Sequence, residues 1–499
     1  MTTARELTKN ERLLFNRRHF LKKVGFGTTS LTLSSFIPRY LTAEESPVAS
    51  TLYNENYRPQ FHFTPQKNWT NDPNGLVYYK GEYHLFFQHN PFGINWGNMT
   101  WGHAVSTDLM HWKQLPNAIE PDELGTIFSG SAVVDWDNTA GFQIGSENVL
   151  VAFYTSAGKH APVEKPFTQS IAYSNDRGRT WQKYKGNPII GNMKDDDNRD
   201  PKVIWHEPTK RWIMALFLDA GDEFALLSSE DLKKWQVIQY LMLPGSRECP
   251  DFFELPVDGD PPNSRWVFWG ANGKYLLGAF DGMKFTPESG PHESRVGNHY
   301  AAQTYSDIPE SDGRRIQIAW MAKGKFPDMP FNQQMSIPCE LNLRTFPEGI
   351  RLCLLPVREI KNIRGPLQAW RAAPLMPAEN ILSAISGELF EIESEIELGY
   401  ASEVGLTLRG TPLVYSVADK TLICKGKKTN LSPKDGKIRL HILVDRTSIE
   451  IFPNDGLMPI FLCFPLDTEN KSLEIFARGG QAVIKSLNVW KLKSIWTAA

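Results

Sequence analysis

Cysteine is scarce and scattered in this chain. Of 499 residues, the five cysteines stand at positions 249, 339, 353, 424 and 463. An odd set at these spacings does not make a disulfide framework. Cys249 adjoins a candidate acid, but no histidine is paired with it in the sequence, so we predict a small buried residue rather than a nucleophile.

Motifs for metal and cofactor binding are also missing. His-Glu-x-x-His is absent, and His84, His89, His103 and His111 lack the spacing of metal ligands. The sequence has no phosphate-binding glycine loop, no dinucleotide fingerprint and no Gly-x-Ser-x-Gly elbow. The acidic run at residues 195–198 lacks the ligand pattern of a calcium loop, which favours a solvated loop. We therefore expect no cofactor and no bound metal.

The charge and hydropathy of the chain narrow the classes of partner. The formal net charge is −2 and no sustained basic stripe occurs, so nucleic acid is not an expected partner. Beyond the N-terminus, no segment is long and apolar enough to be transmembrane. The expected partner is therefore a small or polymeric substrate, and the oligomeric state stays open.

Residues 1–43 resemble a twin-arginine export signal. Arg17-Arg18 precedes a modest apolar and hydroxyl-rich stretch that ends near Ile37, and a plausible cleavage site follows at residues 41–43. The stretch is too short and too polar to be a stable membrane anchor. The alternative is a basic surface helix. We expect export to the periplasm or the medium, with no stable membrane insertion after the signal is removed.

What the chain does have is a repeated strand pattern with an acidic residue at the head of three copies. Asp72 lies in Asn-Asp-Pro-Asn-Gly, Asp200 in Arg-Asp-Pro and Glu248 in Glu-Cys-Pro, and each precedes a run typical of paired strands. Asp-Pro-Asn-Gly by itself is most simply a turn. The common register of the three acids favours instead one shared site, as in carbohydrate-cleaving enzymes.

The period of the repeat predicts a β-propeller. Unit starts near Asn71, Phe128, Arg199, Glu248 and Tyr300 give five units of roughly 50 to 70 residues, a period typical of propeller blades. One four-stranded blade cannot bury both faces, but five arranged radially cover one another. We therefore predict an all-β chain with a five-bladed propeller over residues 55–355, whose innermost strands bring the acids together at the axis.

The pattern changes after the last unit. Residues 356–374 are rich in arginine and proline and are predicted to be a linker. Over residues 375–499, apolar and acidic residues alternate, as at 390–393 and 449–451, and turns separate short strands. This indicates a C-terminal β-sandwich of two sheets. It has no acidic triad, so we expect it to stabilise the propeller or border the substrate cleft.

Tryptophan is abundant, with 15 residues, and its positions suggest two roles. Those that end repeat units are predicted to pack inside blades: Trp112, Trp181 and Trp235. Those near the acidic segments could either pack or stack on a sugar ring: Trp69, Trp96, Trp101 and Trp320.

The ordered motifs resemble those of glycoside hydrolase family 32, which contains invertases, inulinases and levanases acting on β-fructofuranosides. The motifs are Trp69-Thr70-Asn71-Asp72-Pro73-Asn74-Gly75, Phe87-Gln88, Trp101-Gly102-His103-Ala104-Val105-Ser106, Phe128-Ser129-Gly130-Ser131, Arg199-Asp200-Pro201, Glu248-Cys249-Pro250, Tyr300-Ala301-Ala302-Gln303 and the sandwich segment 444–452. The resemblance runs from about Phe61 to the C-terminus. It departs at Thr70, where methionine is common, and at Cys339, where arginine is frequent.

The resemblance implies a retaining glycosidase. Asp72 would be the nucleophile, Glu248 the general acid/base and Asp200 the stabiliser of the transition state. An ionised carboxylate traps the oxocarbenium-like centre while a protonated one serves the leaving oxygen. The residues carried over as substrate contacts are Asn71, Gln88, Trp96, Phe128 and Ser129, together with Arg199 and, as a possible stacking surface, Trp320.

The leading hypothesis is an exo-acting fructanase on levan or inulin that also hydrolyses sucrose. One alternative is an inverting, arabinan- or xylan-directed propeller glycosidase. Another is a non-catalytic glycan-binding propeller, which would be expected to lose at least one acid. The sequence leaves open the preferred linkage, exo or endo attack, and whether water or a sugar is the acceptor.

Overall fold

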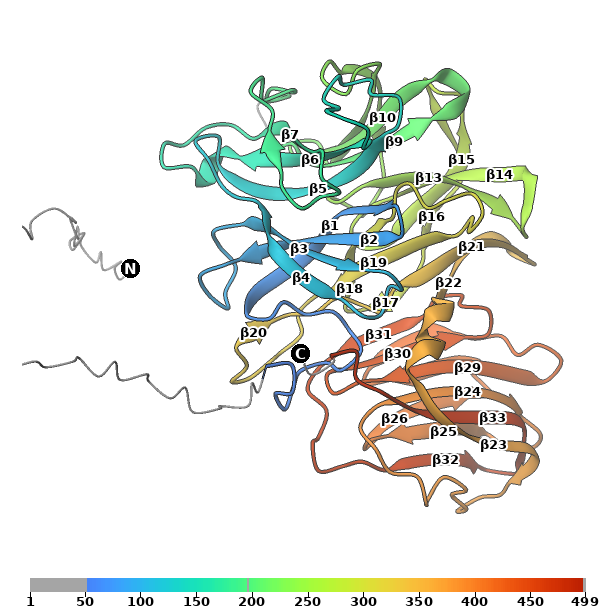
Figure 1. Cartoon of the computed structure of the whole chain (residues 1–499). Coiled ribbons are helices and arrows are strands. Elements are labelled where there is room, and N and C mark those ends of the chain that lie inside the picture. Colours follow the sequence, from blue (N-terminus) through green and yellow to red (C-terminus); the bar gives the residue numbers. More distant parts are fainter. Residues whose placement is uncertain (1–51, 195–196, 497–499) are drawn as a thin grey trace, which may run out of the picture. The chain divides into compact units, whose positions relative to one another are not determined.

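The computed structural model describes residues 52–194 and 197–496, in which nearly all regular structure is β-strand (Figure 1). The helical segments of this part are the short 3-10 turns η1 (Gly158–His160), η2 (Glu207–Thr209) and η3 (Arg358–Ile363). The predicted all-β class is confirmed. Across the two described ranges, no helix is long and apolar enough to cross a membrane. The predicted export signal at residues 1–43 and the acids Asp195 and Asp196 lie outside the described residues.

Five successive groups of antiparallel strands follow one another in the propeller, and a parallel contact between Val257 and Leu343 joins the fourth and fifth groups into one sheet. The first group is β1 (Asn68–Tyr79), β2 (Glu82–Asn90), β3 (Thr100–Ser106) and β4 (Lys113–Ile119), and the second is β5 (Thr126–Asp135), β6 (Val149–Ala157), β7 (Thr168–Ser174) and β8 (Gln182–Lys183). The third is β9 (Arg199–His206), β10 (Arg211–Leu218), β11 (Glu223–Ser229) and β12 (Gln236–Met242), and the fourth is β13 (Asp251–Val257), β14 (Asp260–Trp269), β15 (Lys274–Phe280) and β16 (Phe285–Glu293). The fifth is β18 (His299–Thr304), β19 (Arg315–Met321), β21 (Cys339–Phe346) and β22 (Gly349–Pro356). This succession is consistent with five blades.

The strands are apolar on both faces because each blade packs between two others. Along β10, Trp212, Met214 and Leu216 belong to a core shared with β6 of the second blade. The alternate residues Ile213 and Ala215 belong to a different core, shared with β13 and β14 of the fourth blade. Successive side chains of a strand point to opposite faces, so a continuous apolar run fills both interfaces.

The first strand of each blade lies innermost, and these strands form a closed ring. β1 contacts β5, β5 contacts β9, β9 contacts β13, and β13 contacts β18. β18 then meets β1. Just beyond β18, the Ser306 backbone N–H donates to the Leu76 carbonyl of β1 at 2.9 Å. Residues at the start of these five strands are therefore brought to one end of the axis.

The C-terminal part is a sandwich of two sheets, as predicted. One sheet runs β17 (Val296–Gly297), β31 (Ile460–Cys463), β30 (Ser448–Pro453), β29 (Lys437–Val444), β24 (Phe390–Glu397), β33 (Ala482–Leu492) and β23 (Arg364–Leu375). The other runs β28 (Lys427–Asn430), β27 (Thr421–Cys424), β26 (Thr411–Ser416), β25 (Glu403–Leu408) and β32 (Leu473–Arg478). Their inner faces share one apolar core. The short strand β20 (Phe331–Asn332) pairs with β1.

Residues 356–374, which the sequence analysis predicts to be a linker, have regular structure. Residues 358–363 form η3, and β23 then pairs with β33 from Arg364 to Leu375. β23 is the edge strand of its sheet, so no strand pairs with its outer side. A proline, which lacks a backbone N–H, is tolerated where that N–H would face outward. Pro366 and Pro374 are therefore tolerated in a strand. The prediction of a linker was wrong because it took these prolines as a sign of irregular structure.

Candidate active site

Irregular pairing at the start of inner strands positions Asp72, Phe128 and Asp200. The register of β1 against β2 shifts between Thr70 and Pro73, and that of β5 against β6 shifts between Ile127 and Gly130. Asp200 lies at the corresponding shift in β9 and has a positive φ of 65°. Such bulges redirect side chains and are common beside active sites. The motifs of Asp72 and Asp200 are thus bulges in the fold, whereas Glu248 lies just before β13.

All ten predicted site residues line one pocket of about 230 Å³. They are Asn71, Asp72, Gln88, Trp96, Phe128, Ser129, Arg199, Asp200, Glu248 and Trp320. Cys249 and Tyr300 line the same pocket. The three acids come from three different blades, so the fold brings together carboxylates that lie far apart in the sequence.

Asp72 is held by its neighbours through both oxygens. The Ser129 hydroxyl donates to Oδ2 at 2.6 Å, and the Asn71 amide donates to Oδ1 at 3.1 Å. Burial raises the pKa of Asp72, while these hydrogen bonds act in the opposite direction. Trp69 lies outside the pocket but donates from Nε1 to the Asn71 side chain at 2.8 Å, which orients that amide.

Asp200 is the most deeply buried of the three acids, with 5% of its surface exposed. Its Oδ2 accepts a hydrogen bond from the Cys249 backbone N–H at 3.0 Å. Burial, opposed by Arg199 and reinforced by the charges of Glu248 and Asp72, raises the pKa of Asp200 to about 7. A carboxyl group in this position exchanges its proton near neutral pH.

Glu248 lies nearer the solvent, with 34% of its side chain exposed. Arg199 donates from Nη2 to Oε1 at 2.9 Å, and the Tyr300 hydroxyl donates to Oε2 at 2.7 Å. Arg199 also pairs with Asp219 at 3.2 Å, and its guanidinium lies over the Phe217 ring. Glu248 is thus oriented from both sides while it keeps access to the pocket mouth.

The tryptophans near the acids have different environments. Trp96 is 49% exposed and lies edge-on to Phe128 with ring centroids 5.9 Å apart, so its indole is available to a ligand. Trp320 lines the pocket, and its Nε1 donates to Gln333 at 3.1 Å. Trp101 is fully buried in a core and does not line the pocket, so its role is packing.

Sequence reasoning did not assign Cys249 and Tyr300 to the site. The Cys249 thiol lies 3.6 Å from Oδ2 of Asp72 and 3.5 Å from Oδ2 of Asp200. Burial and these acids raise the pKa of the thiol, so it stays protonated, which agrees with the prediction of a buried, non-nucleophilic residue. Tyr300 begins the fifth repeat unit. The repeat that indicated a shared site for the acids therefore also indicated a place near that site for Tyr300.

Within the described part of the chain, one group has a spacing that would suit a metal ion: Glu391, Glu393 and His441 in the sandwich. Arg364 already donates to both carboxylates, at 2.6 Å to Glu391 and 3.0 Å to Glu393. The guanidinium therefore supplies the positive charge, and the group is better described as an ion-pair network.

A β-propeller pocket that joins three differently held carboxylates is typical of a glycoside hydrolase. Comparison with known proteins identifies the family. The chain belongs to the glycosyl hydrolases family 32: the family's N-terminal domain matches residues 62–356 and its C-terminal domain matches residues 359–491. This membership leaves no support for the arabinan- or xylan-directed alternative.

The relatives refine the class. The chain is 43% identical over 494 residues to the levanase of Bacillus subtilis (strain 168), covering 90% of this chain and 72% of that protein. It is 31% identical to the extracellular exo-inulinase of Aspergillus ficuum, covering 89% of this chain and 96% of that protein. The crystal structure of the exo-inulinase from Aspergillus awamori is similar, with a TM-score of 0.80 and 30% identity over 89% of this chain and 100% of that chain. The chain is therefore a β-fructofuranosidase-type glycoside hydrolase.

Proposed function

We propose that the enzyme is an exo-acting fructanase that removes terminal fructose from levan or inulin and also hydrolyses sucrose. The observation that carries this proposal is the meeting of Asp72, Asp200 and Glu248 in one small pocket. A small pocket suits the end of a chain better than its middle. Levanase, exo-inulinase and a yeast invertase, 35% identical over 419 residues, are among the relatives.

The three acids divide the reaction according to their surroundings. Asp72, fixed through both oxygens, attacks C2 of the fructosyl unit and forms a covalent bond to it. As the bond from C2 to the leaving oxygen breaks, that oxygen takes a proton from Glu248. Water then attacks C2 and gives a proton to Glu248, while the bond from C2 to Asp72 breaks and restores the Asp72 carboxylate. Fructose is thereby released with retention. Glu248 suits this role because it is the acid with access to the mouth, where leaving group and water pass.

Asp200 acts on the sugar rather than on the leaving group. It is buried and lines the pocket, where its oxygens can accept hydrogen bonds from ring hydroxyls. Such contacts strengthen as positive charge develops on the ring, so they favour the transition state over the bound substrate. Its raised pKa means that the ionised fraction of Asp200 grows as pH rises towards and past 7.

Products and variants test this proposal. Timed analysis on levan, inulin and sucrose should give fructose alone from the earliest times, whereas a ladder of oligomers would mean endo attack. Asp72→Ala should abolish hydrolysis of all three. The exposed Asp137→Ala is the matched control, because it removes a carboxylate from the surface and should leave activity unchanged. Substantial turnover by Asp72→Ala would overturn the nucleophile assignment.

The same proposal includes export through the twin-arginine pathway, directed by residues 1–43. The pattern around Arg17-Arg18 supports it, and an extracellular relative agrees with it. Replacing both arginines with lysine should retain the enzyme in the cytoplasm, as measured by activity in cell fractions. Unchanged export of that variant would exclude this route.

A further inference from the structure

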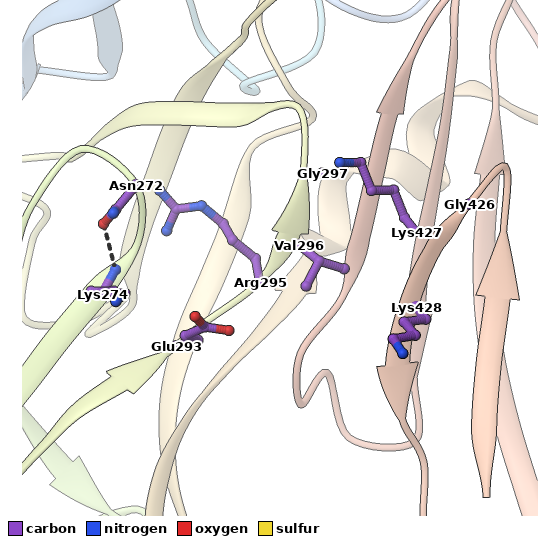
Figure 2. A pocket seen from close by; sticks show the side chains of 9 residues that line it. All are labelled: Asn272, Lys274, Glu293, Arg295, Val296, Gly297, Gly426, Lys427 and Lys428. Carbon is purple, nitrogen blue, oxygen red and sulfur yellow. Dashed lines mark hydrogen bonds between the residues drawn. The ribbon is translucent and has the colours of Figure 1, made fainter. Parts of the chain in front are cut away.

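A second pocket, of about 440 Å³, lies where β15 to β17 meet the turn between β27 and β28 (Figure 2). Its lining includes four basic residues: Lys274, Arg295, Lys427 and Lys428. Lys427 and Lys428 are exposed, as expected of solvated charges. Arg295 differs, because only 5% of its surface is exposed. A buried guanidinium is costly unless its donors are satisfied.

Arg295 directs its donors into the protein rather than into this pocket. Nη2 donates to the Ala271 carbonyl at 3.1 Å, Nη1 to the Ser294 hydroxyl at 2.9 Å and Nε to the His299 carbonyl at 3.4 Å. Among the described residues, none of its hydrogen-bond partners is a carboxylate. Figure 2 shows the side chain reaching towards the loop that contains Asn272. Burial lowers the pKa of Arg295 to about 9, which still leaves it charged at neutral pH.

The loop of residues 271–273, which accepts the hydrogen bond from Arg295, is packed directly against the Arg295 side chain. Ser294 donates from its hydroxyl to the Gly273 carbonyl at 2.8 Å, which anchors the loop a second time. Gly273 has a φ of 84°, and a Cβ there would collide with the Arg295 guanidinium. This close approach requires glycine.

The same loop clamps the segment that carries Glu248. The Ala271 backbone N–H donates to the Glu248 carbonyl at 3.0 Å and to the Arg247 carbonyl at 3.1 Å. The Asn272 amide donates to the Gly245 carbonyl at 2.7 Å. The carbonyl of Ala271 that receives Arg295 also receives the Ala301 N–H at 2.9 Å, next to Tyr300.

The backbone of this segment needs such support. Glu248 has a φ of 57° and Cys249 a φ of 38°, a left-handed conformation that residues other than glycine seldom adopt. Such conformations persist only where the surrounding structure holds them. Ala271 supplies that restraint, and Arg295 fixes Ala271.

We propose that Arg295 is a positioning residue for the acid/base Glu248, acting through the Ala271 backbone. It touches no substrate. The inference rests on the proposed role of Glu248. Without Arg295, the Ala271 carbonyl loses its charged donor and the Glu248 segment relaxes, so the carboxyl group no longer meets the leaving oxygen at the right distance and angle.

The test compares substrates that differ in their need for a proton. Sucrose needs general acid assistance, whereas an aryl β-fructofuranoside with an acidic phenol needs little, and azide can intercept the fructosyl-enzyme without a general base. Arg295→Met should lower kcat on sucrose roughly tenfold with KM changed less than about twofold. On the aryl substrate with azide the loss should be less than about threefold. Arg295→Lys, which keeps a donor, should recover part of the sucrose activity.

Controls separate positioning from other effects. Lys428→Ser removes one positive charge from the same pocket without touching the loop, and it should leave both activities unchanged. An equal loss on both substrates for Arg295→Met, or no loss on sucrose, would overturn the inference. Glu248→Gln tests the underlying role separately: full sucrose hydrolysis by that variant would remove the acid/base assignment, whatever Arg295→Met does.

Discussion

The hydroxyl of Tyr300 lies 2.7 Å from Oε2 of Glu248 and donates a hydrogen bond to it. The tyrosine is the second residue of β18, the inner strand of the fifth blade, and the glutamate precedes β13 of the fourth, so the bond crosses from blade to blade. Burial, with the nearby charge of Glu248, raises the pKa of Tyr300, and the phenol therefore keeps its proton as a donor. The orientation of Glu248 depends on a residue outside the acidic triad.

Tyr300→Phe should therefore lower kcat about tenfold to a hundredfold, since a hydrogen bond to a charged group contributes about 1.5–3 kcal/mol. Steady-state kinetics on sucrose would measure the effect. Tyr79→Phe is the matched control, because the Tyr79 hydroxyl also donates to a carboxylate, Glu147, at 3.0 Å, outside the pocket. Full activity in Tyr300→Phe would mean that Arg199 alone orients Glu248.

Trp96→Ala should raise KM about fivefold to tenfold with little change in kcat. An indole that stacks on the fructosyl ring binds substrate and transition state alike, so its loss weakens affinity rather than the chemical step. Trp136→Ala controls for the loss of a half-exposed indole, because Trp136 is 51% exposed and lies outside the pocket. A fall in kcat at unchanged KM would instead mean that Trp96 contacts the transition state more strongly than the bound substrate.

The sequence could predict the meeting of the acids because each recurs at the same point of a repeat. Asp72 and Asp200 both lie at a shift in strand register, so equal positions in sequence became equal positions around the axis. The direction in which a side chain points could not be predicted in the same way. Tyr300 was identifiable as a unit start, but its contact with Glu248 depends on bulge geometry that the sequence does not specify.

Burial near the site was equally hard to predict. Trp96 and Trp101 stand five positions apart beside the same acidic segment, yet one is half-exposed and the other fully buried. Trp101 lies within β3 and donates from Nε1 to the Phe128 carbonyl, so it fixes the inner strand of the next blade. Trp96 precedes β3 in a loop. Which side of the strand boundary a residue occupies decides its role, and boundaries are poorly determined by local sequence.

Asp200 should make stability depend on pH. Its pKa in the folded protein, about 7, lies above the ordinary value of 3.8, so the folded state holds the proton more tightly. The resulting stability is fully present below pH 3.8 and is lost as pH rises through about 7. The side chain in the Asp200→Asn variant does not ionise, so that variant does not lose this stability as pH rises. Its thermal midpoint relative to the wild type should therefore be higher at pH 8 than at pH 5, and calorimetry at both values measures it. The same difference for exposed Asp137→Asn should be zero at both pH values.

His62 should give a dependence of the same sign over a higher pH range, because it pairs with two buried sandwich carboxylates. Nδ1 lies 2.8 Å from Asp445 and Nε2 lies 3.3 Å from Glu450. Burial alone would lower the pKa of His62, but the two carboxylates outweigh burial and raise it to about 9. The stabilisation is therefore complete below pH 6.5 and is lost as pH rises through about 9.

His62→Gln should cost about 3–5 kcal/mol near pH 6, since it leaves two buried carboxylates without a cation. The cost should shrink towards pH 10, where the imidazole of the wild type is neutral and gives up the same ion pairs. Unfolding by urea across this range measures it. His111→Gln, which breaks a partly exposed pair with Asp108, should cost less than about 1 kcal/mol. A large cost for His62→Gln that does not change with pH would show that His62 contributes by packing and hydrogen bonding, with no charge on its ring.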